Sequence, residues 1–146
     1  MRVLFYYSNP DWSGTARAFA SAGAGLAGRG YQVTFACAAD SVVEQRLSQS
    51  PFEVIPLVGG ESKMRESWRL RDVMLKHFVE VVFVSTDRDH QVAGGAMRLA
   101  GRGAVIRRVR AGERLQIGSG GRWGSRLAAT GFLFSDAAEM QRAAPQ

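Results

Sequence analysis

The sequence predicts an α/β domain built on a Rossmann-like parallel sheet with helices on both faces. Its strand-like segments are continuous apolar runs, such as residues 2–7 and 78–84, rather than alternating patterns. Such runs are typical of parallel strands that are buried on both faces. Segments with helical patterning separate the runs, and this alternation indicates right-handed crossover units in one parallel sheet.

Each strand is expected where apolar, β-branched and aromatic residues cluster, at residues 2–7, 31–36, 52–57, 78–84, 104–109 and 131–134. The run at 78–84 is the most apolar of these. Pro56 lies near the end of the third strand. It indicates that this strand stops or reaches a sheet edge there, because proline has no amide hydrogen for the ladder.

Helices are expected between the strands, at residues 15–29, 41–48, 64–77, 91–101, 123–129 and 136–143. Short polar side chains precede several of them and are suited to cap a helix. Ser13 or Thr15 is expected to cap the first helix, Asp40 the second and Ser135 the last. Residues 111–122 are polar and glycine-rich and are expected to form a loop.

Length and composition indicate one globular domain. The chain has 146 residues, of which 46% are hydrophobic and 22% charged, and it contains no apolar stretch of membrane-spanning length. Arg2 is followed by only five apolar residues, so we expect no signal peptide. Cys37 is the single cysteine and fits a reducing compartment. The protein is therefore expected to be cytoplasmic.

The formal net charge of +6 indicates a surface that attracts anions, such as nucleic acid, acidic lipid headgroups or phosphorylated small molecules. Lys63 and Lys76 are the only lysines, and the many arginines occur with abundant Ala and Gly, as is typical of a GC-rich genome. Aromatic residues that could stack on bases are not interleaved with the arginines. We therefore do not expect nucleic acid as a partner.

Open α/β sheets bind ligands at the carboxyl ends of their strands, near the point where the strand order reverses. This selects the loops after the first, fourth and fifth strands, at residues 8–14, 85–90 and 110–122. In the first loop, Gly14 allows close backbone approach, and free amides at the helix start favour an anion. Ser13 and Thr15 share this turn. In the alternative interpretation these residues form an ordinary turn and helix cap without a ligand. Trp12 is placed to stack on a sugar ring or to cover the sheet edge.

The loop after the most apolar strand gathers polar and charged side chains, namely Ser85, Thr86, Asp87, Arg88, Asp89 and His90. Asp87 or Asp89 is suited to accept a proton from an attacking hydroxyl. Asp89 and His90 are therefore the candidate catalytic residues, and the others, with Arg108, are candidate ligand contacts. In the alternative interpretation Asp89 only caps the next helix, Arg88 pairs with a neighbour and His90 is solvated.

Residues 23–28 spell G-x-G-x-x-G. A dinucleotide site needs these glycines in the turn between a strand and a helix, whereas here they lie late in the first expected helix. We interpret them as small residues that let the helix pack closely, with a packing role for Gly25 and a cap near Gly28 or Gly30. The sequence contains no metal-ligand cluster, Walker motif or nucleophile elbow, so neither a metal nor a cofactor is expected.

The third expected helix carries Met64, Trp68 and Leu75 on one side, flanked by basic residues that include Arg65 and Arg69. Two interpretations fit this stripe. It lies on an anionic membrane, where each basic residue contributes on the order of 1 kcal/mol, or it packs on its own sheet. The candidate membrane-facing residues are Met64, Arg65, Trp68 and Arg69.

With these features in place, the chain resembles the N-terminal half of a GT-B glycosyltransferase, in the large retaining group often called glycosyltransferase family 4. Residues 1–38 are similar to the family's opening, with a strand, a small-residue turn, a helix and a G-[HY]-x-V-T strand (GYQVT here). Residues 80–112 are similar to its hydrophobic strand, polar loop (STDRDH here), helix and strand that runs into arginines. Residues 130–142, TGFLFSDAAEMQR, resemble the segment where a strand ends in Ser before a helix.

The resemblance implies a single Rossmann-like acceptor-binding domain over residues 1–146, with the nucleotide-sugar-binding domain outside this chain. That second domain, in the same or a partner chain, adds roughly 150–200 residues. The implied reaction is transfer of a sugar from a nucleotide sugar to a glycan or lipid-linked acceptor, with the isolated chain inactive. This chain departs from the family in having Ser13-Gly14-Thr15 where many members have paired glycines, and Phe83 and Ser85 where many have histidines.

The second functional hypothesis is a stand-alone binding module. In this hypothesis the basic third helix holds the chain on an anionic membrane, at the cytoplasmic face of the inner membrane, and the chain recruits a catalytic partner there. The sequence does not decide between the two hypotheses.

Overall fold

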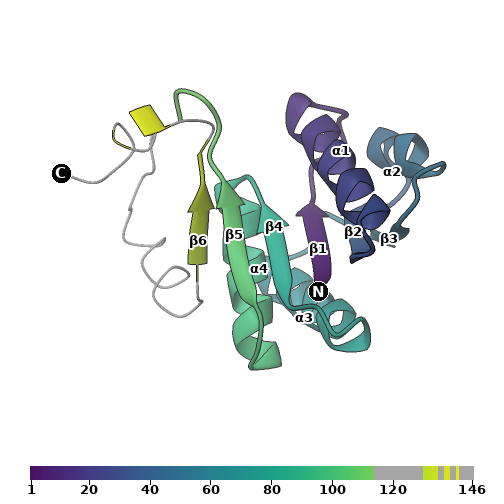
Figure 1. The fold of residues 1–146 in the computed structure, drawn as a ribbon. Helices are drawn as coiled ribbons and strands as arrows, with labels where there is room; N and C mark the ends of the chain where they lie inside the picture. The colour runs from purple at the N-terminus through teal and green to yellow at the C-terminus, as the bar shows by residue number, and fades with distance from the viewer. Residues whose placement is uncertain (114–129, 135–136, 139–140, 142–146) are drawn as a thin grey trace.

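Six strands form one parallel sheet at the centre of the structure, a computed structural model that describes residues 1–113, 130–134, 137, 138 and 141 (Figure 1). The strands are β1 (Arg2–Tyr7), β2 (Gln32–Ala38), β3 (Glu53–Leu57), β4 (Val81–Val84), β5 (Ala104–Arg108) and β6 (Thr130–Leu133). The helices with both ends inside the described residues are α1 (Gly14–Gly28), α2 (Val42–Leu47), α3 (Lys63–Lys76) and α4 (Asp87–Ala100). The α/β fold class expected from the sequence is confirmed.

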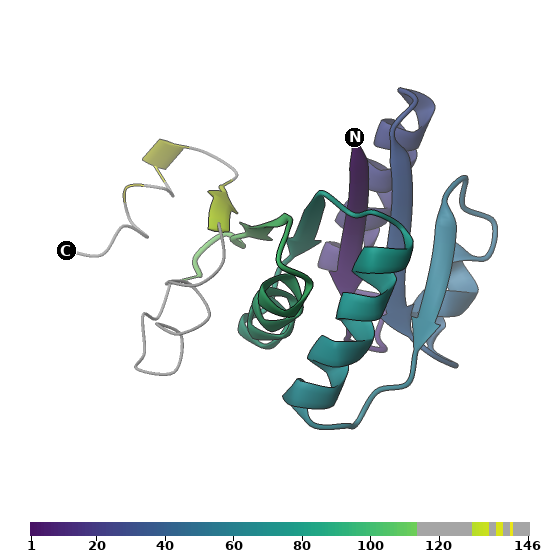
Figure 2. The same ribbon diagram turned by 90° about the horizontal axis from the view of Figure 1, so that it is seen from below.

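The strand order is β3-β2-β1-β4-β5-β6, and every neighbouring pair is parallel. Helices α1 and α2 cover one face of the sheet, and α3 and α4 cover the other (Figures 1 and 2). In β1, Phe5 packs with Phe19 of α1, whereas Leu4 and Tyr6 pack on the opposite face with Leu70 of α3. Both faces of β1 are buried, which explains its continuous apolar run. The order reverses between β1 and β4, where sheets of this kind bind ligands.

Helices α1 and α3 begin within one residue of the expected positions, whereas α2 and α4 have other caps than expected. Helix α4 begins at Asp87 instead of residue 91, because the hydroxyl of Thr86 accepts the Asp89 amide at 3.1 Å and caps the helix. Asp89 therefore lies inside the first turn and is not the cap. Helix α2 is capped by Ser41, whose hydroxyl accepts a helix amide at 3.2 Å. Asp40, the expected cap, precedes it with a φ of 55°.

Strand β4 begins at Val81 instead of residue 78, because Phe78 is exposed and has a positive φ of 52°. The other boundaries follow the sequence closely. Ser13 caps α1, and Pro56 lies in β3, which is an edge strand as predicted. The loop and short helix expected over 114–129 and the cap expected at Ser135 lie outside the described residues. The last expected helix is described only at residues 137, 138 and 141, which are helical.

The G-x-G-x-x-G run lies in the body of α1 rather than in a turn, as expected. Gly23 is buried, and a Cβ atom there would lie 3.0 Å from Cε1 of Phe52. Gly25 is exposed, and a Cβ atom there would meet nothing within 4 Å. The packing glycine is therefore Gly23, and the expected packing role of Gly25 is wrong.

These two glycines make a matched pair of alanine substitutions. Gly25→Ala is expected to raise the free energy of unfolding by about 0.5–1 kcal/mol, because alanine favours the helix and its methyl group enters open space. Gly23→Ala is expected to lower it, since overpacking against the Phe52 ring costs about 1–3 kcal/mol and exceeds the helix gain. Chemical denaturation of both variants measures the two effects. A stabilising Gly23→Ala would contradict the packing role assigned to Gly23.

Candidate functional site

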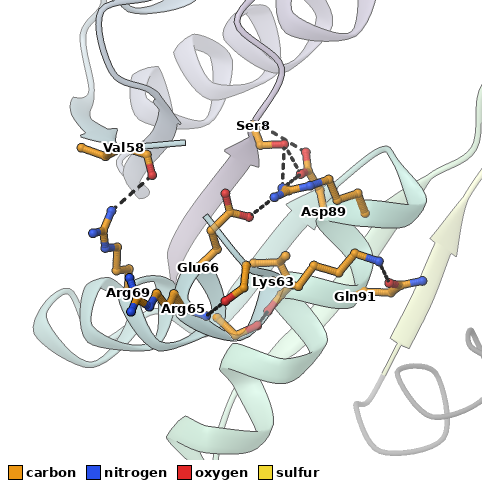
Figure 3. A network of polar contacts seen from close by, with 12 residues as sticks. Ser8, Val58, Lys63, Arg65, Glu66, Arg69, Asp89 and Gln91 are labelled. Atoms are coloured by element: carbon orange, nitrogen blue, oxygen red, sulfur yellow. Dashed lines mark hydrogen bonds and ion pairs between the residues drawn. The ribbon is translucent and has the colours of Figure 1, made fainter. Parts of the chain in front are cut away.

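The carboxyl ends of β1 and β4 meet at the point where the strand order reverses. Phe5 of β1 pairs with Phe83 of β4, so Ser8 and the start of α4 follow neighbouring strands. The Ser8 amide donates to Oδ2 of Asp89 at 3.1 Å, and the Ser8 hydroxyl donates to Oδ1 of the same carboxylate (Figure 3). Asp89 therefore joins the end of β1 to the first turn of α4.

Arg88 extends this contact to α3. One guanidinium nitrogen of Arg88 pairs with Oε2 of Glu66, and the other donates to the Ser8 hydroxyl oxygen at 3.5 Å. The Glu66 side chain is only 8% exposed, whereas the Arg88 side chain is 37% exposed. Ser8, Glu66, Arg88 and Asp89 form what we call the switch-point cluster, in which Arg88 is the charged group that reaches solvent.

Burial sets the protonation behaviour of this cluster. It raises the pKa of Asp89, although hydrogen bonds from Ser8 and the charge of Arg88 oppose the shift. Burial also raises the pKa of Tyr6 on the adjacent strand, and the charges of Asp89 and Glu66 raise it further. For Arg88, burial lowers the pKa, but the hydrogen bond and charge of Glu66 outweigh it and the net shift is upward. Tyr6 therefore stays protonated and Arg88 stays charged at neutral pH.

The turn between β1 and α1 is held by hydrogen bonds of its own. The Ser13 hydroxyl accepts the Ala16 amide at 3.3 Å, and it lies 2.6 Å from the Tyr7 hydroxyl. Gly14 is the first helical residue; it is exposed, and a Cβ atom there would enter open space. Thr15, the next residue, is buried. Gly14 therefore leaves open space at the start of α1.

Trp12 does not face the switch-point cluster. Its side chain is half-buried and packs on the α1 side of the sheet, with the Arg46 guanidinium of α2 6.0 Å from the ring centre. The structure thus favours the second of its two expected roles, cover of the sheet, over stacking on a ligand beside Asp89.

A second polar group lies at the carboxyl ends of β4 and β5. The Arg107 side chain is only 5% exposed and pairs with the carboxylates of Asp87 and Glu113. The Ser85 hydroxyl donates to the Arg108 carbonyl at 3.4 Å, so the backbone of Arg108 joins this group. The sequence analysis missed Arg107 and Glu113, because a buried arginine cannot be told from a solvated one by residue type.

His90 and Asp89 contact different residues. Its ring is buried and meets the Phe132 ring edge-on, with 6.1 Å between the centroids. Burial lowers the pKa of His90, and the charge of Arg107 lowers it further against an opposing effect of Asp87. No described residue makes a hydrogen bond to its Nε2. The two candidate catalytic residues therefore belong to different polar groups.

The sequence analysis also missed Ser8 and Glu66. Ser8 follows a buried strand directly, and Glu66 lies one turn before Leu70 and two turns before Met74, on the buried side of α3. A carboxylate at helical spacing with apolar residues was the signal that could have identified Glu66.

The opposite side of α3 is exposed. Met64 is 67% exposed and Trp68 is 47% exposed, with Arg65 also exposed beside them. The interpretation that this stripe packs on the sheet is therefore wrong for Met64 and Trp68. Arg69 instead pairs with Glu61 at 2.9 Å. No helix in the described part of the chain is long and apolar enough to cross a membrane.

No group of three or more potential metal ligands of the His, Cys, Asp and Glu types occurs among the residues that the structure describes. The arrangement at the switch point instead offers an exposed guanidinium, an open glycine at a helix start and a buried carboxylate. Such groups can orient a hydroxylated or anionic ligand at the edge of the sheet.

Comparison with solved structures identifies the same fold in glycosyltransferases. MurG from Acinetobacter baumannii matches with a TM-score of 0.67 at 15% identity, over 92% of this chain and 42% of that chain. A glycosyltransferase from Rickettsia africae matches with a TM-score of 0.63 at 10% identity, over 73% of this chain and 29% of that chain. A putative UDP-N-acetylglucosamine 2-epimerase from Listeria monocytogenes matches with a TM-score of 0.60 at 18% identity, over 78% and 31% of the respective chains.

The chain thus has the Rossmann-like fold of a GT-B domain, as the sequence resemblance implied. No family model matches the sequence, and no curated protein matches it. The chain spans 29–42% of the length of these solved structures. An epimerase stands among them, so the fold by itself does not fix a reaction.

Proposed function

We propose that this chain is the acceptor-side domain of a glycosyltransferase that moves a sugar from a nucleotide sugar to a glycan or lipid-linked acceptor. The observation that carries the proposal is the switch-point cluster, which lies where open α/β sheets bind their ligands. The solved glycosyltransferases of the same fold support it. Retention of anomeric configuration is part of the proposal through the sequence resemblance.

Within this function the exposed groups at the carboxyl edge contact the substrates. Gly14 is exposed at this edge and the Arg88 side chain is partly exposed, and Ser13 and Thr86 cap the two helices that begin there. Asp89 holds the Ser8 hydroxyl and acts on the substrates through it, as a positioning residue. His90 is neutral near neutral pH, because its pKa is lowered, and is the remaining candidate for proton transfer.

The donor half of such an enzyme is a second Rossmann-like domain. We propose that this domain binds the nucleotide sugar, either further along the same polypeptide or in a partner chain, and that no metal or other cofactor is needed. The chain's share of the solved glycosyltransferases, 29% and 42% of their length, leaves room for such a domain. The bond between the sugar and the nucleotide then breaks in the cleft between the two domains.

We expect residues 1–146 alone to produce no transfer or hydrolysis from UDP-, GDP- or ADP-sugars, and to support turnover once the second domain is supplied. The physical reason is that the phosphate-binding groups for the donor lie on that domain. Product detection by mass spectrometry across the donor panel measures this. Robust turnover by the isolated chain would contradict the proposal.

A second candidate function is recruitment of a catalytic partner to the cytoplasmic face of an anionic membrane. The exposure of Met64 and Trp68 beside Arg65 favours it. An exposed aromatic and a flexible apolar side chain next to a cation suit the boundary between headgroups and acyl chains.

We expect the chain to bind vesicles rich in phosphatidylserine and not neutral ones, with weaker binding as salt shortens the screening length below about 10 Å. The variant Met64→Ser/Arg65→Glu/Trp68→Ser should lose at least about tenfold in apparent affinity. Phe78→Ser, which removes another exposed aromatic flanked by Arg2 and Arg102, is the matched control and should bind normally. Flotation assays measure both, and unchanged binding of the triple variant would refute the membrane function.

A further inference from the structure

The amino edge of the sheet, opposite to the switch-point cluster, has two partly open grooves that share an exposed aromatic side chain. This edge is at the lower end of β1 in Figure 1, beside the N-terminus. One groove has a volume of about 490 Å³ and includes Tyr31 in its lining, and the other has a volume of about 540 Å³ and includes Arg102. Arg2 and Phe78 line both grooves. Phe78 is therefore the residue on which the two grooves meet.

Phe78 occupies a position that suits another residue type better. It is 57% exposed, and its φ of 52° lies in the left-handed region that favours glycine. An aromatic ring in water and a left-handed backbone both cost free energy, and glycine or asparagine would avoid both costs. Backbone strain of this kind and exposed aromatic side chains are typical of residues that contribute to binding.

Cations surround the Phe78 ring. The guanidinium carbons of Arg2 and Arg102 each lie 5.3 Å from its centre, within the range of a cation–π interaction. Arg2 also donates to the carbonyl of His77 at 3.4 Å, where α3 ends. Arg102 and Lys76, which lines the first groove, form no hydrogen bond or ion pair within the described part of the chain. Two cations at this edge therefore have no carboxylate partner.

The two carboxylates that line the grooves already have partners. Oε2 of Glu80 accepts the Arg2 amide at 3.1 Å, and Oε2 of Glu53 lies 3.4 Å from Nδ1 of His77. These carboxylates would repel the continuous row of phosphates of a nucleic acid. An acidic peptide can instead place single carboxylates on the unpaired cations and an apolar side chain on the exposed ring.

We propose that the amino edge around Phe78, Lys76 and Arg102 is a docking surface for an acidic segment of a partner protein. Carboxylates of the segment pair with Lys76 in one groove and with Arg102 in the other, and an apolar side chain between them covers Phe78. The surface lies at the edge opposite to the switch-point cluster, so a bound partner leaves the carboxyl edge free. Docking there is independent of any sugar transfer.

The test is a titration of the isotope-labelled chain with the acetylated and amidated peptide Glu-Glu-Leu-Leu-Glu-Glu, up to about 10 mM, a level that detects millimolar affinity. We expect shifts of the backbone amides of residues 2, 31–33, 76–80 and 102–103, which weaken as salt is added. The peptide Lys-Lys-Leu-Leu-Lys-Lys should cause none. No shift of these amides with the acidic peptide, or equal shifts with the basic one, would overturn the proposal.

Two variants test the ring and the charge separately. Phe78→Asn should abolish binding of the acidic peptide without lowering the melting temperature, because asparagine tolerates a positive φ. Arg102→Glu should weaken binding by at least about tenfold. Arg17→Glu makes the same charge change at an exposed position in the first turn of α1, at the opposite edge, and should bind normally. Unchanged binding by either Phe78→Asn or Arg102→Glu would refute the docking surface.

Anionic vesicles distinguish an acidic protein segment from a lipid surface. Phe78→Ser should bind vesicles rich in phosphatidylserine as the wild type does, and should lose binding of the acidic peptide. Loss of vesicle binding in Phe78→Ser would make lipid headgroups the occupant of this edge and overturn the proposal.

Discussion

Replacing Asp89 with alanine is expected to lower the free energy of unfolding by about 2–3 kcal/mol. The side chain is fully buried and accepts both the amide and the hydroxyl of Ser8. Alanine leaves both donors without their partner and leaves Arg88 with Glu66 as its remaining carboxylate partner. The change therefore loosens the contact between the end of β1 and the first turn of α4.

Asparagine at the same position provides the matched control. Its amide oxygen can accept the Ser8 amide, and its amino group can donate to the Ser8 hydroxyl oxygen. Asp89→Asn is therefore expected to cost less than about 1 kcal/mol. Denaturant unfolding of the wild type and the two variants measures the difference, and equal losses in Asp89→Ala and Asp89→Asn would contradict the assigned hydrogen bonds.

Comparison of the wild type with Asp89→Asn also tests the protonation of Asp89. Burial raises its pKa above the ordinary value of 3.8, so the folded state holds the carboxyl proton more tightly than the unfolded state. This contribution to stability is fully present below pH 3.8 and is lost as the pH rises through the raised folded pKa. The stability of the wild type relative to Asp89→Asn should therefore fall as the pH rises across that window. A difference that does not vary with pH would refute the raised pKa.

The sequence was sufficient to predict the sheet, because the apolar runs that indicate strands are local features of the sequence. The continuous apolar run of β1 reflects burial on both faces, whereas β4 is fully buried only on the face of Val82 and Val84. Pro56 marked the edge strand correctly. The start of α4 was misplaced because Thr86 and Asp89 are both good caps by residue type. Only the tertiary structure shows that the Asp89 carboxylate accepts from Ser8 at the end of β1.

The candidate site was predictable only in part, because its contacts join distant segments. The loops after β1 and β4 were chosen by the rule for strand ends, and Arg88 and Asp89 do lie together there. Glu66 was not found, because the pattern of α3 drew attention to the Met64–Trp68 side, while the buried side is formed around Leu70. Because α3 carries apolar residues on two sides, its sequence alone does not show which side packs on the sheet.

Gly14→Val is expected to reduce turnover by about 100-fold in the complete two-domain enzyme, while the melting temperature stays unchanged. A Cβ atom at Gly14 meets no atom within 4 Å, so the valine side chain does not clash within the chain. It projects instead from the start of α1 into open space, where we propose that a ligand approaches the carboxyl edge. A displacement of about 1 Å of a bound reactant is enough for a loss of this size.

Gly25→Val is the matched control, because it adds the same side chain to the same helix at another exposed glycine with open surroundings. The most direct test of the central claim, that the carboxyl edge of β1 and β4 is the ligand-facing side of this domain, is the ratio of turnover numbers of Gly14→Val and Gly25→Val in the complete enzyme. We predict a ratio near 0.01, with Gly25→Val equal to the wild type and both variants equally stable. A ratio near 1 would contradict the claim, and selective loss of turnover in Gly25→Val would move the ligand to the glycine motif of α1.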